Sequence, residues 1–291
     1  MFMEHNCEQS KLEQQELKQV EQRQKTFNGL SATEWASLSS SVWTGFSTPR
    51  NKKQLDHGAT YPEKLCDRLI TMYSKLGDVV LDPFLGTDTT AISAIKNNRL
   101  AIGIELTDRF FKVASESIEQ FGIEQVQLFH GDCAEKLKEL NRNSIQLTVT
   151  SPPYADLIHK IVKDRSTVHK NTLFANATTN LYSDDVRDLG NMSLTEYIPK
   201  VEVIMKELFR VTENGGYNIW VVKDFRDTKH GIPYVDLHTK IANAGELAGF
   251  LYHDLIIWDQ NANRRLVLLG YPSVFYVNQN HSYIVVMRKP N

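Results

Sequence analysis

A short loop and three acidic residues suggest a ligand site. Residues 82–90 read DPFLGTDTT between an apolar run and a helical pattern. Gly86 would let the backbone approach a ligand, and the start of the following helix favours an anionic group. Thr89 and Thr90 could donate their hydroxyls to a carboxylate held there. This pattern predicts that an anionic ligand binds where the loop meets the helix.

Two further acids follow at regular intervals. Glu105 comes roughly 20 residues after Asp82, a spacing at which an acid meets ribose hydroxyls in nucleotide-binding sheets. Asp132 follows the next apolar run and could accept a hydrogen bond from an adenine amino group. Each acid alone could be a helix cap or a turn residue. Together with Gly86, the three predict a nucleoside-containing ligand.

A second group of chemically suggestive residues is Thr150-Ser151-Pro152-Pro153-Tyr154. Two consecutive prolines restrict the backbone, so a carbonyl and the Ser151 hydroxyl can point at one reacting atom. Tyr154 offers a flat face on which an extruded base could stack. The segment is a candidate catalytic motif beside the ligand site.

These residues need a sheet to bring them together. Apolar runs predict strands, and the segments between several of them have helical periodicity, which is typical of βαβ units on a parallel sheet. The acids and the catalytic motif then share the carboxyl edge of that sheet. The predicted strands are 78–84, 100–105, 126–130, 145–149, 216–223, 251–258 and 281–288, and the predicted helices are 88–97, 108–120, 133–140, 195–211 and 235–249.

The motifs resemble those of bacterial and phage DNA amino-methyltransferases, especially the N4-cytosine branch. Residues 82–90 are similar to the DPFxGxGTT cofactor loop, residues 150–154 to the (T)SPPY catalytic motif, and residues 57–65 to the HPAxFPxxL segment. Weaker similarity includes residues 214–217, 223–225 and 281–283. The resemblance covers roughly residues 50–288.

The resemblance implies an α/β fold with a Rossmann-like seven-stranded methyltransferase sheet, flanking helices and an antiparallel last strand. It implies S-adenosyl-L-methionine as cofactor and double-stranded DNA with a flipped base as substrate. The implied cofactor-binding residues are Thr60, Tyr61, Pro62, Asp82, Pro83, Phe84, Gly86, Thr89, Thr90, Glu105 and Asp132, and the implied catalytic residues are Ser151, Pro152, Pro153 and Tyr154.

By the same resemblance, Ser151 and the Pro152 carbonyl accept hydrogen bonds from the exocyclic amino group that is methylated. C5-cytosine chemistry is excluded, because it uses a cysteine after a proline and no cysteine here follows one.

Serine at the first catalytic position favours N4-cytosine. An N6-adenine DNA enzyme, or a related RNA methyltransferase, is the alternative. A catalytically silent DNA-binding subunit is a second one, because Asp88 replaces the second loop glycine. If that position needs a positive φ, Asp tolerates it less well than Gly.

The expected organisation is one domain, residues 35–291, after a Gln- and Glu-rich tail or helix at residues 1–34. Residues 35–53 read as an extended loop. The polar insertion 155–193 and the loop 259–280 are the candidate target-recognition loops, and the insertion follows the fourth strand. Their cations are expected to contact DNA: Lys160, Lys163, Arg165, Lys170, Arg264 and Arg265.

Composition limits the other possibilities. The 291 residues include 33 Lys and Arg against 35 Asp and Glu, so the net charge of -2 excludes a histone-like electrostatic DNA binder. The three cysteines lack CxxC spacing, so no disulfide framework and no metal site is expected. With no long apolar run, we expect a cytoplasmic protein without membrane contact, in a restriction-modification setting with a possible cognate endonuclease.

Overall fold

The structure is a computed structural model of the whole chain. It describes residues 26–46, 61–119, 121, 125–154, 183–227, 230–263, 266, 268–269 and 272–291. Within these residues, no helix combines the length and the apolar character that a membrane crossing requires.

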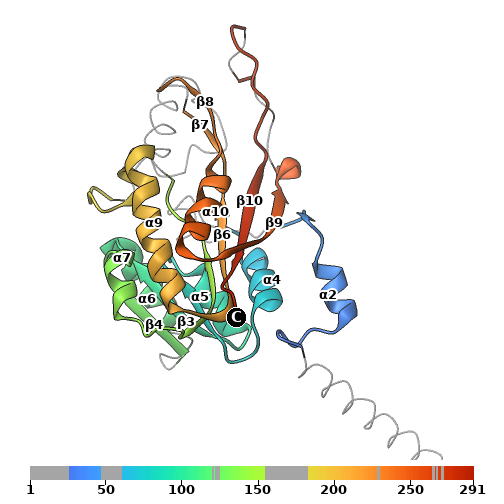
Figure 1. Cartoon of the computed structure of the whole chain (residues 1–291), viewed down its shortest axis with the longest axis vertical. Helices are drawn as coiled ribbons and strands as arrows, with labels where there is room; N and C mark the ends of the chain where they lie inside the picture. The colour runs from blue at the N-terminus through green and yellow to red at the C-terminus, as the bar shows by residue number, and fades with distance from the viewer. Residues whose placement is uncertain are drawn as a thin grey trace, which may run out of the picture.

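A mixed, mostly parallel sheet organises the chain (Figure 1). Its order is β1-β9-β10-β6-β5-β2-β3-β4, and β10 is antiparallel to both of its neighbours. Seven of these strands are the predicted ones, so the predicted methyltransferase sheet with an antiparallel last strand is confirmed. Their bounds are Val79–Asp82 (β2), Leu100–Glu105 (β3), Val126–His130 (β4), Ile145–Thr150 (β5), Thr212–Val222 (β6), Leu251–Asp259 (β9) and His281–Arg288 (β10).

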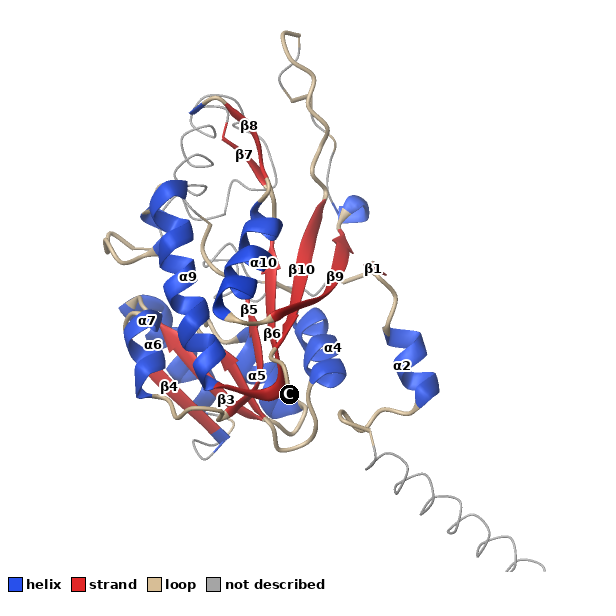
Figure 2. Cartoon of the chain, viewed as in Figure 1, coloured by secondary structure: helices blue, strands red, loops and turns tan. Residues whose placement is uncertain are grey.

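Helices cover both faces of the sheet (Figure 2). On one face, α7, α9 and α10 pack in a buried cluster that includes Tyr197, Leu208 and Ile241. On the other face, α4, α5 and α6 pack in a second cluster that includes Leu69, Ala94 and Ala114. The bounds are Glu63–Tyr73 (α4), Thr89–Lys96 (α5), Asp108–Glu119 (α6), Cys133–Lys136 (α7), Leu194–Val211 (α9) and Leu237–Ala248 (α10).

The sequence prediction of an extended loop from residue 35 is wrong in part. Helix α2 (Ala32–Leu38) begins with a capping box, in which Ser31 and Glu34 satisfy each other's backbone N–H groups. Strand β1 (Val42–Trp43) then adds an eighth strand by pairing parallel to β9. A two-residue strand has no hydrophobic period of its own, so only pairing with β9 reveals it. Helix α2 also spans the boundary predicted between residues 34 and 35.

The carboxyl edge of the sheet carries two projections (Figure 1). One is the hairpin of β7 (Phe225–Asp227) and β8 (Ile232–Val235), which follows directly from β6. The other is the long connection between β9 and β10, where Leu269 and Tyr276 form an antiparallel bridge. Arg226 links the two projections by donating to the carbonyl of Val277. Both therefore rise from the edge where the predicted site residues end their strands.

We expect Trp43→Ala to destabilise the protein although β1 is so short. Trp43 is 1% exposed, its indole N–H donates to the Ser40 carbonyl at 2.6 Å, and the Arg68 guanidinium lies 4.0 Å from its ring centroid. Removing such a side chain costs about 3–5 kcal/mol of the free energy of unfolding in a urea titration. Val42→Ala is the matched control, because Val42 is 53% exposed and should change stability by less than about 0.5 kcal/mol. Equal effects of the two variants would contradict the anchoring role of Trp43.

Candidate cofactor and catalytic site

A buried carboxylate, Asp82, joins the predicted cofactor loop to the predicted catalytic motif. Its Oδ1 accepts from the Thr150 hydroxyl at 2.5 Å and from the Phe84 backbone N–H at 3.0 Å. Its Oδ2 accepts from the Thr90 hydroxyl at 2.5 Å and from the Tyr61 hydroxyl at 3.4 Å. Thr150 immediately precedes Ser151, so one side chain ties the end of β5 to the start of α5.

Burial affects the ionisation of this cluster. It raises the pKa of the Asp82 carboxyl above its ordinary value, although the hydrogen bonds from Thr150, Thr90, Phe84 and Tyr61 oppose the rise. Burial first, and the negative charge of Asp82 second, raise the pKa of the Tyr61 phenol well above its usual range. Tyr61 therefore stays protonated and serves as a donor. The resemblance placed Tyr61 at the cofactor, and the structure places its hydroxyl on Asp82 and Thr90.

Glu105, at the end of β3, holds the backbone of the glycine loop. Its Oε2 accepts from the Gly86 N–H at 2.9 Å, and its Oε1 accepts from the Thr107 N–H at 2.8 Å and from the Thr107 hydroxyl. Gly86 has φ of 61°, a conformation that a glycine adopts without strain. Glu105 is 8% exposed, and burial raises the pKa of its carboxyl. Glu105, which is predicted to bind the ribose hydroxyls, therefore also fixes the backbone of the loop at Gly86.

Asp132 begins α7 and forms an ion pair that the sequence did not suggest. Its Oδ1 accepts from the Ala134 N–H at 3.0 Å, which caps the helix, and its Oδ2 accepts from Lys200 Nζ at 2.9 Å. Lys200 comes from α9, far along the chain. Asp132 is thus both a helix cap and a member of the row of acids along the carboxyl edge.

Asp88 has the positive φ that the sequence analysis considered for this position. Its φ is 145° and its ψ is -9°, so this position does favour glycine. Asp88 is 4% exposed and directly precedes α5, but its side chain makes no capping hydrogen bond to the helix. Aspartate at position 88, where the similar loops have glycine, therefore introduces backbone strain and a buried carboxyl group.

The hydroxyl groups of Thr87 and Thr89 in the same loop show whether the predicted cofactor would find hydrogen-bond donors there. The Thr87 and Thr89 hydroxyl oxygens are buried and have no hydrogen-bond partner in the described part of the chain. A buried hydroxyl without a partner costs free energy, and an anionic or polar ligand group would satisfy it. Thr90, by contrast, already donates to Asp82. The loop thus offers the unsatisfied donors that a ligand such as the methionine carboxylate of the cofactor needs.

The catalytic motif lies directly after β5. Pro152 is buried, Ser151 is half-buried, and Tyr154 packs against the cluster beneath α9. A Cβ placed on Gly190 would lie 3.5 Å from Pro153 Cβ, so residues around Gly190 rest on the motif. Asp188, two residues earlier, contributes to the raised pKa of Glu105. The end of the predicted recognition insertion thus lies at the edge that carries Glu105 and the catalytic motif.

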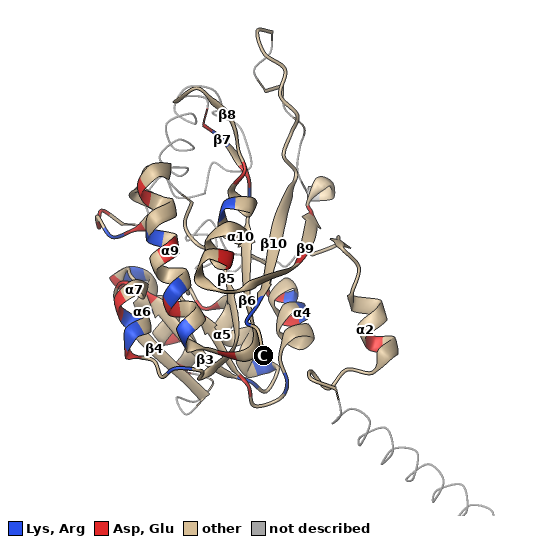
Figure 3. Ribbon diagram, in the orientation of Figure 1, with Lys and Arg blue, Asp and Glu red and all other residues tan. Residues whose placement is uncertain are grey.

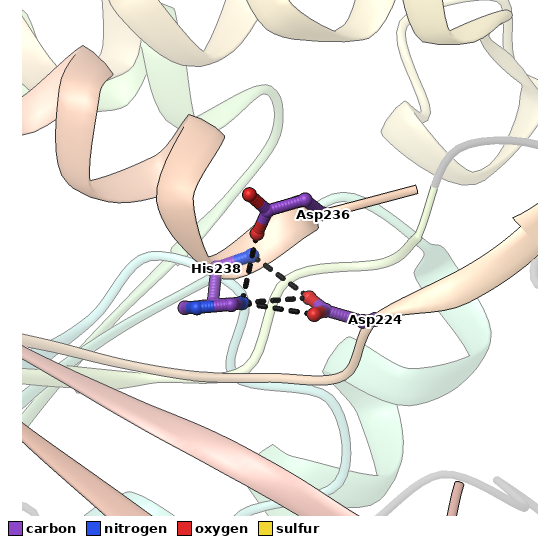
Figure 4. A group of neighbouring side chains, drawn as sticks. All are labelled: Asp224, Asp236 and His238. Atoms are coloured by element: carbon purple, nitrogen blue, oxygen red, sulfur yellow. Dashed lines mark hydrogen bonds and ion pairs between the residues drawn. The ribbon is translucent and has the colours of Figure 1, made fainter. Parts of the chain in front are cut away.

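A further polar cluster follows β6, with Asp224, Asp236 and His238 grouped at the start of α10 (Figure 4). Asp224 accepts from the N–H groups of Leu237 and His238 and from the Tyr234 hydroxyl, and it pairs with the His238 ring. His238 stacks on Tyr283 with ring centroids 3.9 Å apart. Asp224 therefore satisfies two N–H groups in the first turn of α10, in addition to the N-cap residue Asp236. Sequence reasoning singled out Asp224 and Tyr283 but not His238.

Several predicted site residues lie outside the described residues. They are Thr60 and the six cations Lys160, Lys163, Arg165, Lys170, Arg264 and Arg265. The described part of the long connection between β9 and β10, from Leu266 to Asn280, carries no charged side chain (Figure 3). Any charge on that projection would therefore come from outside the residues described.

Comparison with known proteins gives one family model and several related sequences and structures. Residues 3–116 match the N6/N4 methyltransferase model, a family of DNA methylases. The type II methyltransferase M.BglI of Bacillus subtilis is 37% identical over 117 residues, which are 40% of this chain and 31% of that protein. The type II methyltransferase M.MthZI of Methanothermobacter thermautotrophicus is 52% identical over 82 residues, 27% of this chain and 23% of that protein.

The matches span less than a third of the length of these curated relatives. Residues 3–116 are thus similar to N6/N4 DNA methylases, and the two relatives are named type II methyltransferases. Among solved structures, an S-adenosylmethionine-dependent methyltransferase from Methanosarcina mazei is 13% identical with a TM-score of 0.45, covering 76% of this chain and 97% of that one. The fold is established by the strand order itself.

We expect the stability conferred by Asp82 to decline as pH rises. Because its pKa is raised in the folded protein, its contribution is full below the ordinary carboxyl pKa and is lost as pH rises through the folded pKa. Asp82→Asn cannot ionise, so the difference in unfolding free energy between wild type and variant should shrink from pH 4 to pH 8. Urea titrations across this range measure it. A difference that is flat or grows with pH would contradict the raised pKa.

Asp88→Gly should stabilise the folded protein by about 1 kcal/mol, because glycine removes the strain of a positive φ. Thermal and urea unfolding would measure the gain. Asn98→Gly is the matched control: Asn98 has φ of 59°, which asparagine tolerates, so its replacement should have a smaller effect. If Asp88→Gly is instead destabilising, the contacts of the Asp88 side chain outweigh the backbone strain.

Proposed function

We propose that this protein is an S-adenosyl-L-methionine-dependent DNA methyltransferase that modifies the exocyclic N4 amino group of cytosine at a short specific sequence. The observation that carries the proposal is the Asp82 carboxylate, which bonds both Thr90 of the cofactor loop and Thr150 of the catalytic motif. A methyl donor and an amino acceptor must meet within bonding distance, and this link holds the two motifs in one arrangement. The homology to restriction-modification methylases supports DNA as substrate.

The residues of the carboxyl edge would hold the cofactor. Glu105 would accept from the ribose hydroxyls with the acceptor capacity that Gly86 and Thr107 leave, and Asp132 would accept from the adenine amino group. Thr87 and Thr89 would donate to the methionine carboxylate, since their hydroxyls are buried and otherwise unsatisfied. When bound, the cofactor supplies an electrophilic methyl group. Asp88 would repel the methionine carboxylate unless its own charge points away.

The catalytic motif would prepare the nitrogen that is methylated. An exocyclic amino group is a weak nucleophile because its lone pair is delocalised into the ring. Ser151 and the Pro152 carbonyl would accept its hydrogen bonds and favour a pyramidal nitrogen. Tyr154 would stack on the flipped base, which pairing in the duplex would otherwise keep out of reach. The chain itself forms no covalent bond to the base in this scheme.

Serine at position 151 supports cytosine N4 over adenine N6, because the resemblance links that residue type to the N4 branch. The cations predicted in residues 155–193 and 259–280 would hold DNA phosphates, and an arginine among them would read a guanine edge. A partner endonuclease of the same specificity would complete a restriction-modification pair.

Nucleoside mass spectrometry of treated DNA tests the assignment. Plasmid DNA from a methylation-deficient host would be incubated with the purified protein and S-adenosyl-L-methionine, digested and analysed. N4-methylcytosine is the expected product. N6-methyladenine alone would overturn the base assignment and keep the site. With no methylated base, but with cofactor or DNA binding retained, the protein would be a silent subunit.

Ser151→Ala should lower turnover more than it lowers DNA affinity, because the lost hydrogen bond is made to the reacting amine. We expect a fall in kcat of roughly tenfold or more, the effect of about 1.4 kcal/mol of lost transition-state stabilisation. Methyl transfer from a tritiated donor and DNA binding by fluorescence anisotropy separate the two effects. Thermal unfolding controls for the fold. A loss confined to DNA affinity would contradict the role given to Ser151.

A further inference from the structure

Lys200, in α9, is a cation that the fold brings to Asp132. Its Nζ donates to Asp132 Oδ2 at 2.9 Å, although 68 positions separate the two residues in the chain. The side chain of Asp132 is 8% exposed and that of Lys200 is 26% exposed. The pair lies mostly away from solvent, so salt screens it less than it screens an ion pair on the surface.

Neither helix capping nor packing requires a lysine at position 200. The cap of α7 is complete without it, because Asp132 Oδ1 accepts from the Ala134 N–H at 3.0 Å. Packing of the side-chain stem would be served equally well by a methionine, which covers apolar surface without a charge. The ammonium group therefore has a role of its own, and that role concerns the second oxygen of Asp132.

The turn that carries Asp132 is attached to the strand end that carries Glu105. The Gly131 N–H donates to the Glu105 carbonyl at 2.9 Å, and Glu105 pairs with His130 in the register of β3 and β4. These backbone contacts hold the two acids at a fixed spacing along the carboxyl edge. A fixed spacing is what the ribose and the adenine of a single nucleoside require.

Two hydrogen bonds fix the plane of the Asp132 carboxylate. The torsion about the Cβ–Cγ bond of an aspartate has a broad distribution, so one bond to Oδ1 leaves it only partly restricted. The bond from Lys200 to Oδ2 restricts it further. A carboxylate has about four acceptor positions. The bonds from Ala134 and Lys200 therefore leave lone pairs, held in a defined direction, to which a ligand can donate.

We propose that Lys200 is a positioning residue for the adenine end of the cofactor: it holds Asp132 Oδ2 so that the free lone pairs of the carboxylate face the adenine amino group. This inference deepens the proposed function and rests on it. Lys200 would act through Asp132 and need not touch the cofactor. Its loss would therefore weaken recognition of the amino group more than it weakens binding of the rest of the cofactor.

Calorimetric titration with S-adenosylhomocysteine and S-inosylhomocysteine tests the proposal, because the second compound has a carbonyl oxygen where adenine has its amino group. Wild type should bind the adenine compound roughly tenfold more tightly, as expected when a charged acceptor loses its donor. Lys200→Met should reduce this preference roughly fivefold, mainly by weakening the adenine compound. Lys200→Arg keeps the cation and should retain most of the preference. A role in helix packing alone would not change the ratio of the two affinities.

Lys138→Met is the matched control. It also removes a lysine that pairs with a carboxylate at 2.9 Å, that of Glu135, but both side chains are exposed, so the preference should stay that of wild type. Lys200→Gln lacks the charge and the reach of lysine and should lose the preference as Lys200→Met does, so the test does not depend on one variant folding.

Three results would overturn the positioning role. They are a wild-type preference in the Lys200 variants without the cation, an equal weakening of both compounds in those variants, and equal binding of the two compounds by wild type. Wild type that binds neither compound would instead overturn the proposed function. That result is distinct from a wild type that binds and prefers the adenine compound while the Lys200 variants behave as it does.

Discussion

The buried carboxylate of Asp82 is the interaction on which the arrangement of the site depends. It ends β2 and accepts from hydroxyls on three separate segments, at Tyr61, Thr90 and Thr150. Burying a carboxyl is unfavourable without such donors, so the strands β2 and β5 and the start of α5 must meet where they do. Moving any one donor would remove one of the four hydrogen bonds that this buried carboxylate accepts. Cofactor loop and catalytic motif are thus positioned by one shared acceptor.

The same principle extends along the carboxyl edge. Glu105 holds the Gly86 N–H, Asp132 caps α7 and pairs with Lys200, and Asp224 caps α10. Each of these acids ends or follows a strand and accepts from a backbone N–H of a neighbouring loop or helix. A carboxylate that is fixed by backbone hydrogen bonds holds its remaining lone pairs in a defined position, where a ligand can donate to them. Under the proposed function, structural and ligand-binding roles would coincide in Glu105 and Asp132.

Two features of the site oppose stability. Asp88 places a non-glycine residue at φ of 145°, and Thr87, Thr89 and Tyr197 bury hydroxyls without partners. Such costs are tolerated where the surrounding structure is well determined, and here the two helix-covered faces of the sheet provide that support. Thr87, Asp88 and Thr89 lie together in the loop that leads into α5, and Tyr197 lies in α9. A bound ligand or base would relieve the unsatisfied donors.

Hydrophobic periodicity and chain order, which are local properties, predicted the seven central strands, the helices α5, α6, α7, α9 and α10, and the sheet edge that carries Asp82, Glu105, Asp132 and Ser151. They did not predict α4. The sequence also identified Asp88 as the position where glycine would be preferred. Only the tertiary structure decided that β1 adds a strand beside β9 and that Lys200 pairs with Asp132. These contacts join residues far apart in the chain, and no local pattern encodes the partner that folding brings to each.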